Sequence, residues 1–194
     1  DLDAKSVDFV VLTYAHIDHS GLLPLIAQRG FRGRIHATPA TCDLLGVMLP
    51  DAAYVQASIA AWKRDRPRRA PGPRAAKSGA RPRRGVEDDG APLYTVGDAQ
   101  AALRLLHRVP YGARRALAPG VELTFADAGH ILGSAIAVLD IEAGGTTRRL
   151  AFSGDLGQPA RPMLPDPEPV ERADLLVVES TYGNRLHRSL ASTY

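Results

Sequence analysis

The chain has 194 residues, of which 45% are hydrophobic, so it is long enough for one domain with a substantial core and too short for two large domains. Its one cysteine, Cys42, excludes disulfides within the chain and argues against a cysteine-built zinc site. The net charge of +3 hides an asymmetry, because ten basic residues and one acid lie within 63–84, and the remainder carries a net charge of −6.

The first part of the chain alternates strand and helix patterns. A β-branched and aromatic run predicts a buried strand over 7–13. Ser20 is expected to cap a helix that runs to about Arg29 and stops at Gly30. The following patterns predict a short strand over 34–38 and helices over about 40–48 and 51–64.

Residues 65–92 differ in character, because they are rich in Arg, Pro, Gly and Ala and poor in large apolar side chains. Such a segment buries too little surface to offset its ordering entropy, which indicates a flexible insertion. Clustered arginines could bind RNA phosphates, and the alternative is a solvated loop without a ligand. The candidate RNA-binding residues are Arg64, Arg66, Arg68, Arg69, Arg81, Arg83 and Arg84.

Beyond the insertion the pattern predicts one helix and then strands. The helix is expected over about 97–107, and the strands over 121–127, 134–142, 147–153 and 174–179. This order favours an α+β layered fold with a largely antiparallel second part. No apolar run reaches the roughly 18 residues of a membrane span and no signal peptide is visible, so we expect a cytoplasmic protein that binds no membrane.

The stretch Tyr14-Ala-His16-Ile-Asp18-His19 packs metal-binding side chains directly behind the first strand. Imidazole and carboxylate together suit zinc, manganese or iron(II), and this spacing can divide the ligands between two neighbouring metals. The alternative is a helix start at Asp18 and Ser20 with two incidental histidines.

Two later strands end in the same way. His130 follows a strand between Gly129 and Gly133, and Asp155 follows another strand beside Gly154. Glycine lets the backbone approach a metal or substrate closely. Three strands that each end in a glycine-flanked His or Asp predict one shared site.

These motifs resemble those of the metallo-β-lactamase superfamily of metallohydrolases. The family signature is His-x-His-x-Asp-His, then a single His, then a single Asp, each at the end of a core strand. Residues 19–24, 129–135 and 178–187 are similar in particular to the β-CASP branch of RNA-processing nucleases. The resemblance implies a partial metallo-β-lactamase αββα sandwich over 1–178 and the start of a β-CASP insertion over 179–194.

The resemblance also implies roles for single residues. His16 and His130 would bind a first zinc, Asp18 and His19 a second, and Asp155 would bridge the two. A hydroxide between the metals would attack the scissile phosphate. Glu179 matches an acidic residue that orients a histidine acid in the β-CASP domain, and His187 is a further candidate.

The chain departs from the family pattern at Tyr14, which stands where the first ligand histidine belongs. A phenol with a pKa near 10 is a poor zinc ligand, so we expect weaker metal binding there, one zinc in place of two, and little activity. The family's N-terminal strands and most of its β-CASP domain lie outside this sequence.

The expected function is zinc-dependent hydrolysis of RNA, with single-stranded DNA as the alternative substrate and a homodimer formed through regions outside this sequence. A catalytically silent RNA-binding or scaffold subunit is the second hypothesis. A third is hydrolysis of a small ester, thioester or lactam, against which the stretch 179–183 argues.

Overall fold

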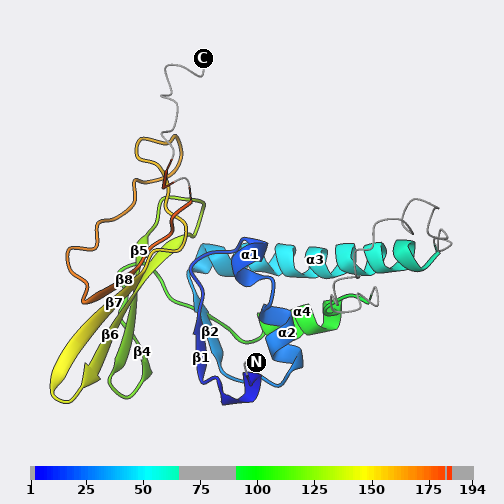
Figure 1. Cartoon of the computed structure of the whole chain (residues 1–194), viewed down its shortest axis with the longest axis horizontal. Coiled ribbons are helices and arrows are strands. Elements are labelled where there is room, and N and C mark those ends of the chain that lie inside the picture. The colour runs from blue at the N-terminus through cyan, green and yellow to red at the C-terminus, as the bar shows by residue number, and fades with distance from the viewer. Residues whose placement is uncertain (1–2, 66–90, 182, 185–194) are drawn as a thin grey trace, which may run out of the picture.

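The computed structural model describes residues 3–65, 91–181 and 183–184. Two β-sheets lie next to each other, and the helices gather against the first of them (Figure 1). The first sheet is parallel, with the order β1-β2-β3. Its strands are β1 (Phe9–Val11), β2 (Arg34–Ala37) and β3 (Leu106–Arg108).

The second sheet has five strands in the order β4-β5-β6-β7-β8. All of its pairs are antiparallel except β7 with β8, which confirms the predicted antiparallel second part. The strands are β4 (Arg115–Ala118), β5 (Val121–Asp127), β6 (Ala135–Ala143), β7 (Thr146–Phe152) and β8 (Leu175–Val177). The prediction missed the short strands β3 and β4.

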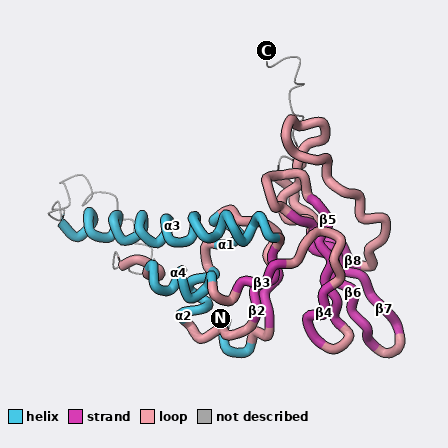
Figure 2. Tube along the Cα trace, turned by 180° about the vertical axis from the view of Figure 1, so that it is seen from behind, coloured by secondary structure: helices cyan, strands magenta, loops and turns pink. Residues whose placement is uncertain are grey.

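The described helices lie on one side of the molecule, as the view from behind also shows (Figure 2). They follow a short 3₁₀ turn at Ala4–Ser6 and are α1 (Ile17–Ser20), α2 (Leu23–Gln28), α3 (Pro39–Asp65) and α4 (Val96–Leu103). The layers are therefore helix, sheet and sheet, which confirms the α+β prediction.

Two helix predictions were wrong in detail. Ser20 does not cap a helix; it ends α1, where its Oγ donates a hydrogen bond to the Ala15 carbonyl. The two helices expected over 40–48 and 51–64 are one continuous helix, α3, with Pro50 inside it. Leu45, Leu49 and Ala53 bury one face of α3 across this proline, and we attribute the helix's continuity to that packing.

The helix expected over 97–107 ends at Leu103. Its start is fixed by a capping box, in which the Thr95 Oγ accepts a hydrogen bond from the Asp98 amide and Asp98 accepts one from the Thr95 amide. His107 therefore lies on β3 and not on a helix, because pairing with His36 on β2 overrides the local helical pattern.

Two apolar clusters hold the layers together. Phe31, Ile35, Leu45 and Leu49 are fully buried between the helices and the first sheet. Leu123 and Phe125 lie at the centre of a second cluster, which Val11 and Phe152 contact, so the two sheets share a core. Each fully buried side chain of this size contributes roughly 1.5–3 kcal/mol.

The long helix α3 bears on the expectation that the chain contains no segment able to span a membrane. By length and composition alone it is the one helix in the described ranges that could cross a membrane, with a mean hydropathy of 1.3, which is weak evidence for such a role. Its buried residues include Thr41, Cys42 and Ala60, and it packs against α4.

Candidate metal centre

The ends of β1, β5 and β7 meet where the two sheets approach each other. The Ala135 amide donates a hydrogen bond of 2.8 Å to the Thr13 carbonyl, which joins the loop after β1 to the start of β6. Gly154 packs so closely on Thr13 that an added Cβ would lie 2.8 Å from the Thr13 Cβ. The three predicted strand ends therefore form one site.

Asp155 is the common partner in this site. Its Oδ1 lies 3.5 Å from His19 Nε2, and its Oδ2 lies 3.8 Å from His130 Nε2. The Tyr14 hydroxyl donates a hydrogen bond of 2.7 Å to the same Oδ2. One carboxylate thus links side chains from the first sheet and the second sheet.

Asp18 and His19 lie within the short helix α1, which begins directly after His16. His19 Nε2 lies 3.8 Å from Asp18 Oδ2, and His19 Nδ1 lies 3.2 Å from Thr13 Oγ1. Because Thr13 holds Nδ1, the other ring nitrogen points toward the two carboxylates. The Asp18 side chain is 71% exposed, so it is the solvent side of this group.

His130 is held by a tight loop. Its amide and the Ile131 amide donate hydrogen bonds of 3.0 and 3.2 Å to Ser134 Oγ. Gly129 and Gly133 have φ values of 62° and 83°, which glycine adopts without strain. His130 Nε2 is buried and has no hydrogen-bond partner among the described residues, which is costly unless a ligand supplies one.

Tyr14 occupies the centre of the site. It is 1% exposed, and its ring centroid lies 4.3 Å from that of His19, 4.8 Å from that of His16 and 5.2 Å from that of His130. Burial, and then the hydrogen bond to Asp155, raise the pKa of the Tyr14 phenol above its ordinary value. The phenol therefore stays protonated and acts as a donor.

Glu179 lies at the edge of the same site. Its Oε1 accepts a hydrogen bond of 2.6 Å from the Leu156 amide, and its own amide donates to Ser153 Oγ. Glu179 thus ties the chain after β8 to the loop that carries Asp155. The contacts of Glu179 were not visible in the sequence, although the residue itself was a candidate.

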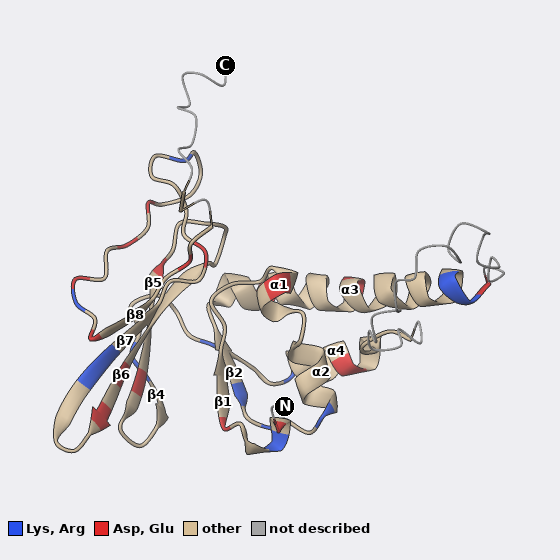
Figure 3. Ribbon diagram, in the orientation of Figure 1, with Lys and Arg blue, Asp and Glu red and all other residues tan. Residues whose placement is uncertain are grey.

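Arg64, the one remaining candidate among the described residues, does not join this cluster. Arg64 lies in the last turn of α3, and the basic end of that helix is the end far from the sheets (Figure 3). His187 and the candidates Arg66, Arg68, Arg69, Arg81, Arg83 and Arg84 lie outside the described residues. Within the described ranges, no three His, Cys, Asp or Glu side chains are already arranged to hold a metal ion.

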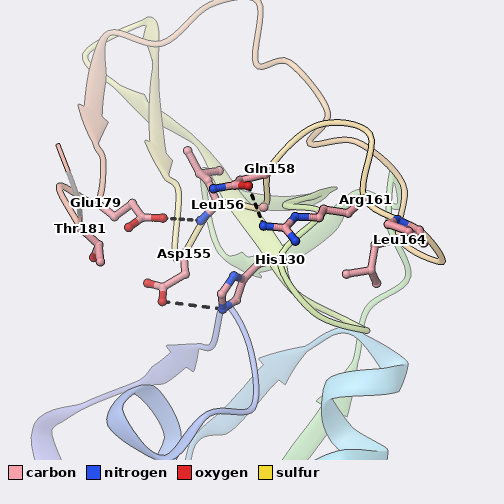
Figure 4. Close-up of a pocket in the computed structure, with 11 residues that line it drawn as sticks. His130, Asp155, Leu156, Gln158, Arg161, Leu164, Glu179 and Thr181 are labelled. Carbon is pink, nitrogen blue, oxygen red and sulfur yellow. Dashed lines mark hydrogen bonds and ion pairs between the residues drawn. The ribbon is translucent and has the colours of Figure 1, made fainter. Parts of the chain in front are cut away.

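Sequence reasoning missed the side chains that support and surround these candidates. Thr13 and Ser134 orient the two histidines, and Gln158 and Arg161 line the cleft beside them (Figure 4). Thr13 and Ser134 carry a weak signal, since each is a polar residue directly adjacent to a strand end. Arg161 lies in a proline-rich turn and carries none.

Relatives of known designation match nearly the whole chain, although no protein-family model matches it. The chain is 36% identical over 191 residues to the ribonuclease TTHA0252 of Thermus thermophilus, which covers 98% of this chain and 36% of that protein. It is 34% identical over 184 residues to the transcription termination factor FttA of Thermococcus kodakarensis, which covers 94% of this chain and 24% of that protein. The chain thus spans about a third or a quarter of the length of these relatives.

Solved structures that are similar to the chain are metallo-β-lactamases. One is the subclass B3 enzyme BJP-1 of Bradyrhizobium japonicum, with 19% identity and a TM-score of 0.40 over 77% of this chain and 41% of that one. Another is SMB-1 in a complex with mercaptoacetic acid, with 16% identity and a TM-score of 0.41 over 82% of this chain and 48% of that one.

The sequence relatives extend over 98% and 94% of the chain, including all three strand ends that carry the His and Asp side chains. These strand ends meet in one site, as the resemblance of the motifs implies. The chain therefore belongs to the metallo-β-lactamase superfamily, in its β-CASP branch.

Proposed function

We propose that this chain carries the metal-binding part of a hydrolase that cleaves phosphodiester bonds in RNA, with zinc as the expected metal. The observation that carries the proposal is the approach of His19 and His130, from two different sheets, to the single carboxylate of Asp155. The names of the sequence relatives, a ribonuclease and a transcription termination factor, support RNA as the substrate.

The side chains on one side of the site have the chemistry that a divalent cation requires, although no three of the described ones are already arranged around a metal position. Asp18, His19 and Asp155 bring two carboxylates and an imidazole together, a donor set that suits zinc, manganese or iron(II). The unpartnered Nε2 of His130 is a further donor. A bound metal of this kind would supply an activated water molecule at neutral pH and neutralise charge on the phosphate.

The other side of the site fits a cation less well. Tyr14 takes the place of a ligand imidazole, and its ring packs beside both His16 and His130, whose own ring centroids lie 5.6 Å apart. Its hydroxyl already donates to Asp155 Oδ2, so that oxygen is engaged. We therefore infer that Asp18, His19 and Asp155 hold one zinc, that the His16 and His130 side binds metal weakly, and that this chain is a weak enzyme.

The remaining roles follow from contacts and from the family resemblance. Asp18, on the solvent side, is the carboxylate that a substrate would meet first, and Glu179 holds the Asp155 loop through the Leu156 amide. We propose a domain boundary near residue 178, where β8 has just ended, with 179–194 as the start of the β-CASP insertion. A cytoplasmic location, a homodimer and single-stranded DNA as the alternative substrate complete the proposal.

A second function is favoured by the same tyrosine. The hydrogen bond from Tyr14 to Asp155 gives the site a satisfied polar contact without metal. A catalytically silent subunit, which binds RNA and does not cleave it, would use the fold with this metal-free site. This alternative predicts RNA binding that is indifferent to chelators.

The first test is the zinc content of the full-length protein with three side chains at position 14. We expect at most one zinc per chain with tyrosine, an increase to two with Tyr14→His, and no increase with Tyr14→Phe, because phenylalanine keeps the ring and adds no ligand. Mass spectrometry measures the zinc content of each variant. Cleavage of a labelled single-stranded RNA is the second readout. Asp155→Ala should abolish zinc binding in every background.

Two zinc ions in the protein with tyrosine would contradict the inferred single site. No zinc in any of the three, together with tight RNA binding, would replace the hydrolase by the silent subunit.

A further inference from the structure

The cleft beside Asp155 carries a feature that the metal-ligand motifs do not explain. It has a volume of about 610 Å³, and one wall is formed by the loop after β7 (Figure 4). The charged side chains that line it are Asp155 and Glu179, which are carboxylates, and Arg161, which is the one arginine or lysine of the lining. An anionic substrate would therefore meet acidic groups on this side and a single permanent cation.

The Arg161 guanidinium is oriented by a neighbour. Its Nη2 donates a hydrogen bond of 2.7 Å to Gln158 Oε1, and both residues line the cleft that His130 also lines (Figure 4). A guanidinium has five donors, and this contact uses one edge of it. No carboxylate forms an ion pair with Arg161 among the described residues, whereas Arg148 and Arg149 each pair with an aspartate.

The loop that carries Arg161 is fastened to the loop that carries His130. The Gly157 amide donates a hydrogen bond of 2.8 Å to the Ala128 carbonyl, and a Cβ on Gly157 would lie 1.7 Å from the Gly129 carbonyl oxygen. A Cβ on Gly129 would in turn lie 2.7 Å from the Pro165 carbonyl oxygen. The two loops are thus in direct backbone contact on both sides of the turn.

The backbone next to Arg161 is also unusual. Ala160 and Met163 have φ values of 60° and 70°, which non-glycine residues rarely adopt. The Ala160 amide donates a hydrogen bond of 2.7 Å to Asp166 Oδ1, which holds the turn in this shape. Strained residues of this kind persist only where the surrounding structure fixes them, and they cluster at binding sites.

We propose that Arg161, oriented by Gln158, is a positioning residue that binds a phosphate of a single-stranded RNA next to the phosphate that lies over Asp155. This inference rests on the proposed function and names one contact of its substrate. A guanidinium binds a phosphate through two parallel hydrogen bonds, which a lysine cannot reproduce. Because the loop is fastened to the His130 loop, the contact would fix the RNA relative to the reacting atoms.

The experiment measures binding of a fluorescein-labelled oligouridine RNA to the full-length protein in the presence of a chelator, at several salt concentrations. Arg161→Ala is expected to weaken binding about tenfold and to reduce the slope of log affinity against log salt by about 0.7, the value of one phosphate contact on a single strand. Arg161→Lys should restore the slope but not the full affinity. Gln158→Leu should weaken binding less than Arg161→Ala and leave the slope unchanged.

The matched control is Arg148→Ala, because Arg148 is an exposed arginine on β7 outside the cleft lining and pairs with Asp174. It should leave affinity and slope unchanged, and thermal unfolding should show that all variants fold. Equal binding by Arg161→Ala and Arg148→Ala would overturn the inference while leaving the metal site untouched. An absence of RNA binding by the unmodified protein both with chelator and with added zinc would overturn the inference and the proposed function together, whereas a failed zinc measurement alone would leave the inference standing.

Discussion

At the scale of single residues, Tyr14 shows how one substitution changes the chemistry of a site without emptying it. The ring fills the space among three imidazoles, and the hydroxyl satisfies Asp155. A buried polar group costs stability when it has no partner, so this contact stabilises the site in the absence of metal. Tyr14, which we propose weakens metal binding, therefore also stabilises the fold through Asp155.

His36 illustrates a different buried histidine, one that no proposed function uses. It is 3% exposed on β2, and its Nδ1 has no hydrogen-bond partner among the described residues. Burial, and then the nearby His107, Arg115 and Arg34, together lower the pKa of His36 to about 4. In the unfolded chain the pKa returns to about 6.5.

This difference predicts that acid destabilises the protein. Between pH 6.5 and pH 4 the unfolded chain binds a proton at His36 that the folded chain excludes, so the free energy of unfolding falls as the pH falls through this window. The full effect is roughly 3 kcal/mol. Urea denaturation at a series of pH values should show it, and His36→Leu should remove most of it.

His107→Gln provides the comparison, because His107 lies on the neighbouring strand and is only half-buried. It should retain most of the pH dependence. Parallel pH profiles for the unmodified protein and His36→Leu would contradict the assignment.

At the scale of elements, the loop contacts around the site make two glycines predict opposite results. A Cβ on Gly157 would collide with the Gly129 backbone, whereas one on Gly46, in the exposed face of α3, would meet nothing within 4 Å. Gly157→Ala should lower the free energy of unfolding by roughly 2–3 kcal/mol, because backbone must move. Gly46→Ala should raise it by about 0.5–1 kcal/mol, since alanine favours a helix.

Chemical denaturation of the two variants beside the unmodified protein measures this contrast. The spectrum of the folded state at zero denaturant serves as the check that α3 is retained in both. A neutral Gly157→Ala would show that the loops after β5 and β7 are not in backbone contact.

The same elements show what could be predicted from the sequence. The ends of β1, β5 and β7 were predictable, because apolar or aromatic residues near each strand end are followed within a few residues by His or Asp, with a glycine beside it after β5 and β7. The strands β3 (Leu-His-Arg) and β4 (Arg-Ala-Leu-Ala) were not, because they contain no β-branched or aromatic residue and form by pairing with neighbouring strands. Arg161 was not predictable either, since its place beside His130 depends on contacts between loops far apart in the sequence.

At the scale of the whole molecule, β8 is an edge strand of the second sheet as far as the described residues extend. Among them β8 pairs with β7 alone, and Leu175, Leu176, Val177 and Val178 are all about half exposed. An apolar strand edge with free backbone groups pairs readily with another chain. We therefore expect the 194-residue chain to self-associate through this strand.

Leu176→Lys should weaken that self-association about tenfold, because a buried leucine contributes roughly 1.5–3 kcal/mol and a charge at an edge opposes pairing. Sedimentation velocity at several protein concentrations measures the change. Leu93→Lys is the control, since Leu93 is equally exposed but lies in a loop before α4. An equal effect of both substitutions would point to general solubility and not to β8.

The meeting of the two sheets at the site has a consequence for folding. His19 lies in α1, which follows β1 of the first sheet, and Asp155 follows β7 of the second sheet. A cation held between them would act as a cross-link between the sheets, and its binding free energy would add to the cohesion of the fold by mass action. Chelation would then lower the free energy of unfolding as well as the activity. The concentration of free metal around the protein would therefore set the fraction of the protein that stays folded.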